Sequence, residues 1–365
     1  MIKIGMVGVG AISGIYIKNI TEVFKEIKLV AVCDLVKEKA IKAKEEYKIE
    51  KIYDTMEELF SDSEIDIVLN LTRPYEHYDV TYAALQAGKH VYSEKPLAAT
   101  LEEGIKLVEL AKEKNLMLGG APDTFLGAGI QTCRKLIEDG FIGDIVGAAA
   151  FMICRGHEGW HPDPEFYYKH GGGPMMDMGP YYLTALTNLL GGIKSVTGVA
   201  RTSFSQRVIG SKPKEGDIIN VEVPTHVTGI MEFDSGAIGT LFTTFDVYNK
   251  GQARFEIYGS EGTLLVPDPN TFGGPIYLLR PEENDYKEIP LMFDYSGNSR
   301  GLGLADMAKS MEIGRECRTT YKQTLHVLEA MDAFKTSSDL KKTIDLKTTF
   351  VKEAPMKRSP IAGVL

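Results

Sequence analysis

The sequence predicts an α/β protein of two parts. An N-terminal parallel-sheet domain (residues 1–122) precedes an α+β domain (residues 123–365) built on a large, open, mostly antiparallel sheet. Three observations support this prediction. The length of 365 residues suggests two domains. In the first third, apolar runs of strand length alternate with segments of helical period, as in βαβ units. Later strand-like runs follow one another through short turns, which is typical of antiparallel pairing.

The first domain is predicted from five apolar runs and the helices between them. Each run has strand length, and each helix carries apolar residues three and four positions apart. The expected strands are 2–7, 28–34, 65–72, 89–95 and 116–122. The expected helices are 15–24, 37–47, 78–88 and 101–115. Such an alternation places the carboxyl ends of all strands along one edge, where ligands of these sheets bind.

The pattern of the second domain differs. It begins with an expected helix at 124–140, a strand at 144–155, a long loop at 156–173 and a helix at 174–191. Further strands are expected at 194–202, 226–234, 237–247, 253–259 and 262–267, and closing helices at 302–313 and 319–336. These helices suffice for one face of the sheet, so the other face needs a different cover.

Composition narrows the functional classes. A net charge of −9 argues against a general nucleic-acid binder. No apolar run reaches the roughly 18 residues of a membrane span. The first residues, MIKIGMVGVG, enter a strand at once and lack the pattern of a secretory signal. The cysteines are far apart and form no CxxC pair, so we expect reduced thiols in a cytoplasmic protein: Cys33, Cys133, Cys154 and Cys317.

A glycine turn, GVGAIS, follows the first strand and opens the first helix. Taken alone it is a plain strand-to-helix turn. In a βαβ unit followed by an acid at the end of the second strand, it matches the Rossmann dinucleotide fingerprint. Ser13 departs from that fingerprint, which usually has Gly or Ala there. We expect the turn to hold the pyrophosphate of NAD through Gly8, Gly10, Ala11, Ile12 and Ser13.

The cofactor prediction depends on Asp34, 24 residues after Gly10. A carboxylate there accepts hydrogen bonds from the adenine ribose and repels a 2′-phosphate. Leu35 follows it, and no arginine comes next. We therefore expect Asp34 and Leu35 to flank the adenosine, and NAD to be preferred over NADP.

The stretch VYSEKPL places Lys95 where an apolar strand ends. A lone lysine in a turn usually belongs to the surface. At the carboxyl end of a strand in a nucleotide-binding sheet, it faces the ligand crevice. An ammonium there would stabilise the alkoxide that develops when a carbinol loses hydride and proton.

The segment AGKHVYSEKPLA resembles the AGKHV-x-x-EKP-x-A signature of the glucose–fructose oxidoreductase, inositol dehydrogenase and rhizopine catabolism (Gfo/Idh/MocA) family. The resemblance extends through GVGAIS, LTRPYEH, RKLIEDGFIGDI and GGGPMMDMGPYYL, and covers at least half the chain in order. It implies a cis peptide before Pro96 and a homodimer or homotetramer packed through the open sheet. It also implies cofactor contacts from Thr72, Arg73, Pro74, His77, Glu94 and Lys95.

Asp177 and Tyr181 lie four residues apart and share a face if one helix contains both. The alternative is a capping aspartate and a core tyrosine. A preceding glycine run and the internal Pro180 favour a site. The family pattern is DxGxH, and Tyr181 occupies the histidine position, as in glucose–fructose oxidoreductase and the dihydrodiol dehydrogenases. We assign proton transfer to Tyr181, alkoxide stabilisation to Lys95 and orientation to Asp177. Another departure is Asp123-Thr124, where many relatives carry an arginine-containing segment.

The loop 156–173 carries aromatic and imidazole side chains close to this pair. An aromatic face against a pyranose, with imidazoles on its hydroxyls, would suit a sugar. A purely structural anchor is an equal alternative. No metal site is expected, because prolines break the histidine spacing. The candidate substrate-binding residues are Lys95, His157, Trp160, His161, Tyr168, Asp177 and Tyr181.

These features predict an NAD(P)-dependent dehydrogenase or reductase. It would transfer a hydride between nicotinamide C4 and a secondary alcohol or ketone of a sugar, inositol or related polyol. Two alternatives stay open: a glycosidase that retains NAD and uses transient oxidation, and a non-catalytic sensor of sugar or NAD. No nucleic-acid or membrane partner is expected.

Overall fold

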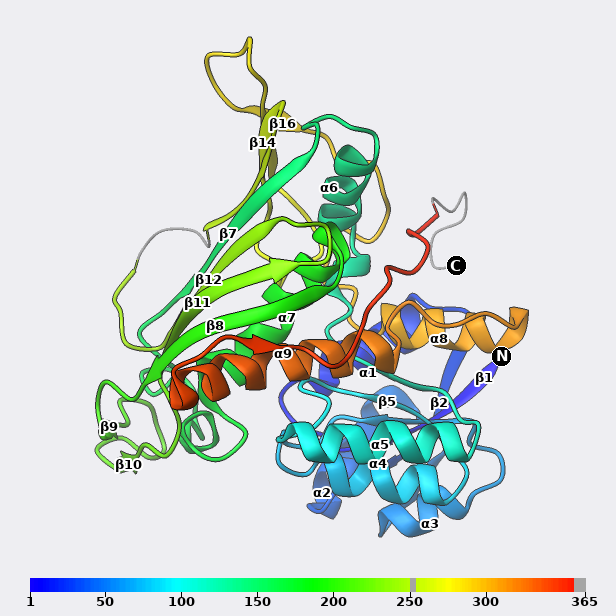
Figure 1. Ribbon diagram of the computed structural model, residues 1–365. Coiled ribbons are helices and arrows are strands. Elements are labelled where there is room, and N and C mark those ends of the chain that lie inside the picture. The colour runs from blue at the N-terminus through cyan, green and yellow to red at the C-terminus, as the bar shows by residue number, and fades with distance from the viewer. Residues whose placement is uncertain (250–253, 358–365) are drawn as a thin grey trace.

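The computed structural model describes residues 1–249 and 254–357 (Figure 1). Ala253, the first residue of one predicted strand, and the last eight residues of the predicted second domain lie outside this part of the chain. The first domain, blue and cyan in Figure 1, contains a six-stranded parallel sheet of order β3-β2-β1-β4-β5-β6. Its strands are β1 Ile2–Val7, β2 Ile27–Cys33, β3 Lys51–Tyr53, β4 Ile67–Asn70, β5 His90–Ser93 and β6 Leu118–Gly120. The predicted parallel sheet is confirmed.

The helices of this domain connect successive strands, as βαβ units require. They are α1 Ser13–Glu22, α2 Lys37–Tyr47, α3 Met56–Ser61, α4 His77–Gln86 and α5 Leu101–Glu113. A capping box fixes the start of α5, where Thr100 and Glu103 exchange side-chain and backbone hydrogen bonds. The sequence interpretation missed β3 and α3, because three and six residues are too short to show a period.

The second domain contains a nine-stranded sheet of order β16-β15-β14-β13-β7-β12-β11-β8-β17. Only β12 and β7 are parallel neighbours, so the predicted mostly antiparallel sheet is confirmed. Its strands are β7 Ile145–Ile153, β8 Ile193–Arg201, β11 His226–Phe233, β12 Ile238–Thr244, β13 Arg254–Gly259, β14 Gly262–Leu265, β15 Ile276–Leu279, β16 Lys287–Ile289 and β17 Ile344–Asp345. A separate two-stranded hairpin pairs β9 Gln206–Val208 with β10 Ile218–Asn220.

The helical segments of the second domain are the 3-10 turns η1 Thr124–Leu126 and η2 Glu165–Tyr168, and the helices α6 Ala128–Glu138, α7 Gly173–Leu190, α8 Leu302–Ile313 and α9 Tyr321–Leu340. The single helix predicted at 124–140 is therefore divided at Gly127, which has an extended backbone. The turn η2 interrupts the predicted long loop 156–173.

Helices cover one face of the large sheet, as predicted. Both α7 and α9 contact its central strands (Figure 1). Gly198 and Gly229 permit this close approach, because a Cβ on either would lie about 3 Å or less from atoms of Phe334 in α9. The opposite face exposes large apolar side chains from three adjacent strands: Val199, Ile230 and Ile238.

The chain returns to the first domain near its end. The amide of Gly120 in β6 donates to the carbonyl of Thr319 over 3.0 Å, just before α9 begins. The buried carboxylate of Asp123 accepts hydrogen bonds from the amides of Gly301 and Gly303 at the start of α8. Residues 120–123 and residues 301–319, far apart in the sequence, therefore meet where the two domains join.

All four cysteines are free; three are buried and Cys154 is partly exposed. Within residues 1–249 and 254–357, no helix is long and apolar enough to cross a membrane.

Candidate active site

The glycine turn lies between β1 and α1. Gly8 has a φ of 98°, and a Cβ there would meet the Leu71 carbonyl group at 2.8 Å, so only glycine fits. A Cβ on Gly10 would project into open space. Ser13 donates its hydroxyl to the carbonyl of Gly10 over 2.8 Å, which explains why serine serves at the third position. No side chain caps the first turn of α1, and the amide of Ser13 donates to the carbonyl of Gly10 over 3.2 Å. A helix start without a side-chain cap suits an anion such as a pyrophosphate.

Asp34 lies directly after β2, beside the glycine turn. One carboxylate oxygen accepts from the amide of Val9 over 2.6 Å, and the other from the amide of Val36 over 2.8 Å. Leu35 is 95% exposed. The carboxylate is thereby held at the end of the sheet, where it could accept hydrogen bonds from the ribose of a dinucleotide.

The loop after β4 leads from Thr72 to His77, the first residue of α4. His77 is buried, and its two ring nitrogens lie 2.7 and 3.0 Å from the carbonyl oxygens of Pro96 and Thr72. It therefore supports the loop from behind rather than facing the crevice. The hydroxyl of Thr72 donates to Asn70, and Arg73 forms an ion pair with Asp163 of the second domain over 3.0 Å.

The end of β5 positions Lys95. Glu94 is buried and accepts from the hydroxyl of Tyr16 and from the amide of Lys95, over 2.7 and 2.9 Å. The peptide between Lys95 and Pro96 is cis, as the family resemblance implies. The Lys95 ammonium donates to Oδ1 of Asp177 over 2.8 Å and to the Asp177 carbonyl oxygen over 2.7 Å. The two domains therefore meet at this ion pair.

Asp177 and Tyr181 both belong to α7, so they share a helix face and Asp177 is no cap. The Lys95 ammonium lies 5.1 Å from the centroid of the Tyr181 ring. The other carboxylate oxygen of Asp177 lies 3.2 Å from Nε2 of His157. The three residues assigned to catalysis, Lys95, Asp177 and Tyr181, are thus brought together with one predicted substrate residue.

The pKa values of Lys95 and Asp177 are determined more by the opposite charges nearby than by burial. Burial alone would lower the pKa of Lys95, but the charges of Asp177, Tyr181 and Glu94 raise that pKa above its usual value. Burial would raise the pKa of Asp177, but Lys95 and His157 hold it below its usual range. Lys95 is therefore a cation and Asp177 an anion at neutral pH.

Tyr181 is 7% exposed. Burial raises its pKa above the usual value, and the charge of Glu94 adds to this, while the cations Lys95 and Arg300 act to lower the pKa. Arg300 comes from the loop before α8 and was missed in the sequence, because nothing near it resembles a motif.

The aromatic residues of the loop after β7 differ in how they lie relative to the Lys95–Asp177 ion pair. The ring of Tyr167 lies 4.1 Å from that of His157, centroid to centroid, and faces the ion pair. Tyr168, the predicted substrate residue, is fully buried and turned away, with its hydroxyl bound to Glu158. Trp160 is 63% exposed, and its ring stands edge-on to those of His157 and His161. Tyr167 was missed because neighbouring tyrosines in a 3-10 turn cannot be ranked by sequence alone.

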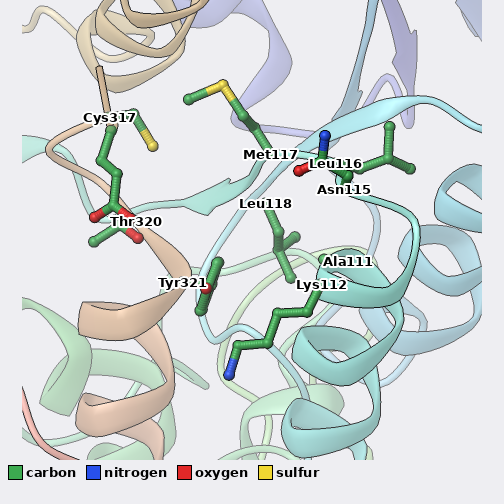
Figure 2. A pocket seen from close by; sticks show the side chains of 10 residues that line it. Ala111, Lys112, Asn115, Leu116, Met117, Leu118, Cys317, Thr320 and Tyr321 are labelled. Atoms are coloured by element: carbon green, nitrogen blue, oxygen red, sulfur yellow. The ribbon is translucent and has the colours of Figure 1, made fainter. Parts of the chain in front are cut away.

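A hollow of about 280 Å³ lies apart from this site, between α5, β6 and the start of α9 (Figure 2). Its lining includes Lys112, Leu118, Cys317 and Tyr321 and none of the candidate catalytic, cofactor-binding or substrate-binding residues. Among the described residues, no group of three or more His, Cys, Asp or Glu side chains could hold a metal ion.

A turn shaped for a pyrophosphate, a carboxylate placed for a ribose and an ion pair at the end of a parallel strand occur together in nicotinamide-dependent oxidoreductases. Two protein-family models match the chain. "Oxidoreductase family, NAD-binding Rossmann fold" covers residues 2–120, and "GFO/IDH/MocA C-terminal domain" covers residues 130–265. The chain belongs to the Gfo/Idh/MocA family of oxidoreductases.

Individual relatives agree with this assignment. An uncharacterized oxidoreductase of Schizosaccharomyces pombe is 31% identical over 339 residues, which span 84% of this chain and 88% of that protein. The scyllo-inositol 2-dehydrogenase (NADP(+)) of Bacillus subtilis is 22% identical over 95% of this chain and 96% of the relative. A levoglucosan dehydrogenase, solved in complex with NADH and levoglucosan, shares the fold with a TM-score of 0.81 and 21% identity, over 94% of this chain and 99% of that one.

The comparisons confirm the predicted family, fold class and kind of activity. The chain is an NAD-binding oxidoreductase, a dehydrogenase or reductase that acts on CH–OH groups. The roles of single residues and the preference for NAD over NADP stay predictions.

Proposed function

We propose that the protein transfers a hydride between nicotinamide C4 and a secondary alcohol or ketone of a sugar, inositol or related polyol. The observation that carries this proposal is the Lys95–Asp177 ion pair beside Tyr181, at the edge of the sheet where the dinucleotide turn also lies. The relatives named for scyllo-inositol and levoglucosan support a polyhydroxylated substrate.

Each side chain has a distinct task in this proposal. In its phenolate form, Tyr181 accepts the hydroxyl proton during oxidation, and as the neutral phenol it returns that proton during reduction. The Lys95 ammonium stabilises the developing alkoxide, because a fixed cation in a site with little water acts strongly on a new negative charge. Asp177 orients Lys95 through two hydrogen bonds from the ammonium. Bound NAD supplies the nicotinamide C4 that accepts the hydride.

The substrate wall is formed by the loop after β7. We propose that His157 and Tyr167 contact the substrate, because both face Asp177. Trp160 and His161 extend this aromatic surface toward solvent. Tyr168 is assigned a structural task instead, because its hydroxyl is committed to Glu158 and its ring lies under Arg207.

The test is a panel of sugars, inositols and glycosides, assayed for NADH formation with NAD and, separately, with NADP. We expect stoichiometric NADH from at least one free sugar or polyol. Glycoside cleavage without net NADH would instead favour the glycosidase alternative. Tight binding of a sugar with no turnover in either direction would favour the sensor.

The assembly and compartment are also proposals. Four free cysteines suit a reducing compartment, so we propose that the enzyme works in the cytoplasm. The exposed apolar face of the nine-stranded sheet supports a homodimer or homotetramer, because such faces mark interaction sites. The negative net charge speaks against a nucleic-acid partner.

A further inference from the structure

A buried arginine lies on the β9–β10 hairpin, beside the loop that forms the proposed substrate wall. Arg207 is the middle residue of β9, and its side chain is 3% exposed. Its guanidinium donates to the carboxylates of Glu158, over 2.9 Å, and Asp246, and to the carbonyl oxygens of Arg155 and Phe245 over 3.4 and 3.2 Å. Two of these partners belong to the loop after β7 and two directly follow β12. The guanidinium therefore joins these two segments.

One connection leads from this arginine to the backbone of His157. Glu158, the next residue, binds Arg207 with one carboxylate oxygen and accepts from the hydroxyl of Tyr168 with the other. The same hydroxyl accepts from the amide of His157 over 3.4 Å. The guanidinium also lies over the Tyr168 ring, 5.4 Å from its centroid. The backbone at His157 is thus connected to Arg207 through two side chains.

A second connection leads to the ring of His157. The carbonyl oxygen of Phe245 accepts from Arg207 over 3.2 Å, and the amide of Phe245 donates to the carbonyl of Thr225 over 2.9 Å. The buried Phe245 ring stands edge-on to His157, with 4.8 Å between the ring centroids. The imidazole therefore packs against a side chain whose backbone Arg207 holds in place.

The turn of the hairpin binds the same loop. The amide of Gly210 donates to the carbonyl of Glu158 over 2.9 Å. The hydroxyl of Ser211 donates to the carbonyl of Glu158 over 3.3 Å and to that of His161. The hairpin and its arginine therefore support the loop from the side opposite Asp177, which His157 approaches over 3.2 Å.

We infer that Arg207 is a positioning residue for the proposed reaction, which sets the place of His157 through Glu158 and Phe245. The inference rests on the proposed function, in which His157 contacts the substrate. Arginine suits this task because its rigid fork of five donors binds two carboxylates and two carbonyls at once, which the three donors of a lysine cannot do. A purely structural arginine would affect the stability of the fold and leave substrate binding unchanged.

Two conservative variants weaken the connection. Arg207→Lys keeps the charge and loses the fork, and Tyr168→Phe keeps the ring and removes the hydroxyl between Glu158 and the neighbouring amide. The matched controls lie elsewhere on the large sheet. Arg280→Lys changes an exposed arginine after β15, and Tyr258→Phe breaks a tyrosine–glutamate hydrogen bond in β13.

Steady-state kinetics of alcohol oxidation give the first readout. In both variants, KM for the sugar or polyol should rise about tenfold or more, the scale of one lost hydrogen bond to the substrate. The KM for NAD should stay unchanged, because the glycine turn and Asp34 belong to the first domain, and kcat should change much less than the sugar KM. In the His157→Ala background, either variant should raise the sugar KM little further, because both act through that side chain.

Trp160, the only tryptophan of the chain, gives a second readout that needs no substrate. It lies in the same loop, and its ring centroid is 5.4 Å from that of His157. A loop held by fewer contacts moves more. We therefore expect the fluorescence anisotropy of Trp160 to fall in Arg207→Lys and Tyr168→Phe, and to stay at the wild-type value in both controls.

A wild-type sugar KM in both variants, or an unchanged anisotropy in both, would overturn the inference, and a loss of thermal stability alone would then make Arg207 a structural residue. A full additional rise of KM in the His157→Ala background would also overturn it. If Arg207→Lys does not fold, Tyr168→Phe alone must show both effects. If the wild type oxidises no sugar or polyol, the proposed function fails, while the anisotropy of Trp160 still decides whether Arg207 and Tyr168 hold the loop.

Discussion

The carboxylate of Asp177 has two partners, one on each oxygen. Lys95 from the first domain binds one oxygen, and His157 from the loop after β7 approaches the other. An anion shared in this way fixes both side chains relative to α7. A substitution of Asp177 would therefore disturb the positions of both the Lys95 ammonium and the His157 ring.

Sequence reasoning selected three residues that the structure brings together, but it selected less well among the residues around them. Lys95, Asp177 and Tyr181 stand in motifs whose spacing on a strand end or a helix turn dictates direction. Tyr167 and Arg300 stand in irregular segments, where no period says which side chain faces the crevice. The interpretation therefore selected Tyr168, whereas Tyr167 is the residue of η2 whose ring lies beside His157.

The cofactor preference depends on Asp34. Replacing Asp34 by Ala together with Leu35 by Arg removes the carboxylate and adds a partner for a 2′-phosphate. We expect the ratio of kcat/KM for NAD to that for NADP to fall by at least about tenfold, since the new arginine–phosphate hydrogen bonds and the removal of a repulsion each contribute about 1 kcal/mol or more. Leu35→Ala is the control and should keep the preference. A wild-type enzyme that binds NADP as tightly as NAD would contradict this role.

Among the elements, long periodic segments were predicted well and short ones were not. The hairpin β9–β10 and the strands β15, β16 and β17, which lie at or next to the edges of the large sheet, have two to four residues each. In β9 and β10 only the middle residue is buried, which hides any apolar alternation. Whether such short segments form strands depends on the strands they pair with, which the local sequence does not show. A contact such as that between Asp123 and α8 is invisible without the fold.

The carboxylate of Asp123 accepts hydrogen bonds from two glycine amides at the start of α8. Burial raises the pKa of Asp123 to about 6, although the amides of Gly303 and Gly301 and the charge of Arg300 act to lower it. Between about pH 4 and pH 6, the folded chain thus keeps a proton that the unfolded chain releases. Stability therefore falls as pH rises through this window, by up to about 3 kcal/mol for a shift of about two units.

Asp123→Asn should remove that part of the pH dependence, because an asparagine oxygen can still accept from both glycine amides and has no proton to lose. Denaturant unfolding at several pH values measures the slope. Asp345→Asn, at an exposed position, is the control and should leave the slope unchanged. Parallel pH curves for wild type and Asp123→Asn would show that this carboxyl does not titrate there.

At the scale of the whole molecule, the open face of the large sheet remains to be covered. Ile238 and Ile313 are both 57% exposed, but Ile238 lies on that face and Ile313 at the end of α8. Ile238→Glu should weaken the proposed oligomer, because it places a charge inside an apolar interface. Ile313→Glu should not. Light scattering over a concentration series distinguishes the two variants, and a wild type that is monomeric at micromolar concentration would contradict the proposed assembly.

In the proposed mechanism both domains contribute, because Lys95 follows β5 of the first sheet, and Asp177 and Tyr181 belong to α7, which covers the second sheet (Figure 1). Lys95→Met should retain NAD binding, which the glycine turn and Asp34 mainly provide. Its turnover should nevertheless fall by roughly 10² to 10⁴. Tyr181→Phe should lose a similar factor and flatten the basic side of the pH–rate profile.

The most direct test of the account is the double mutant Lys95→Met/Tyr181→Phe, measured by kcat for NADH formation beside both single variants. If the two residues act on one proton, the double mutant loses far less than the product of the single losses. Fully multiplicative losses, or a Lys95→Met enzyme with near-normal turnover, would contradict the shared-proton mechanism.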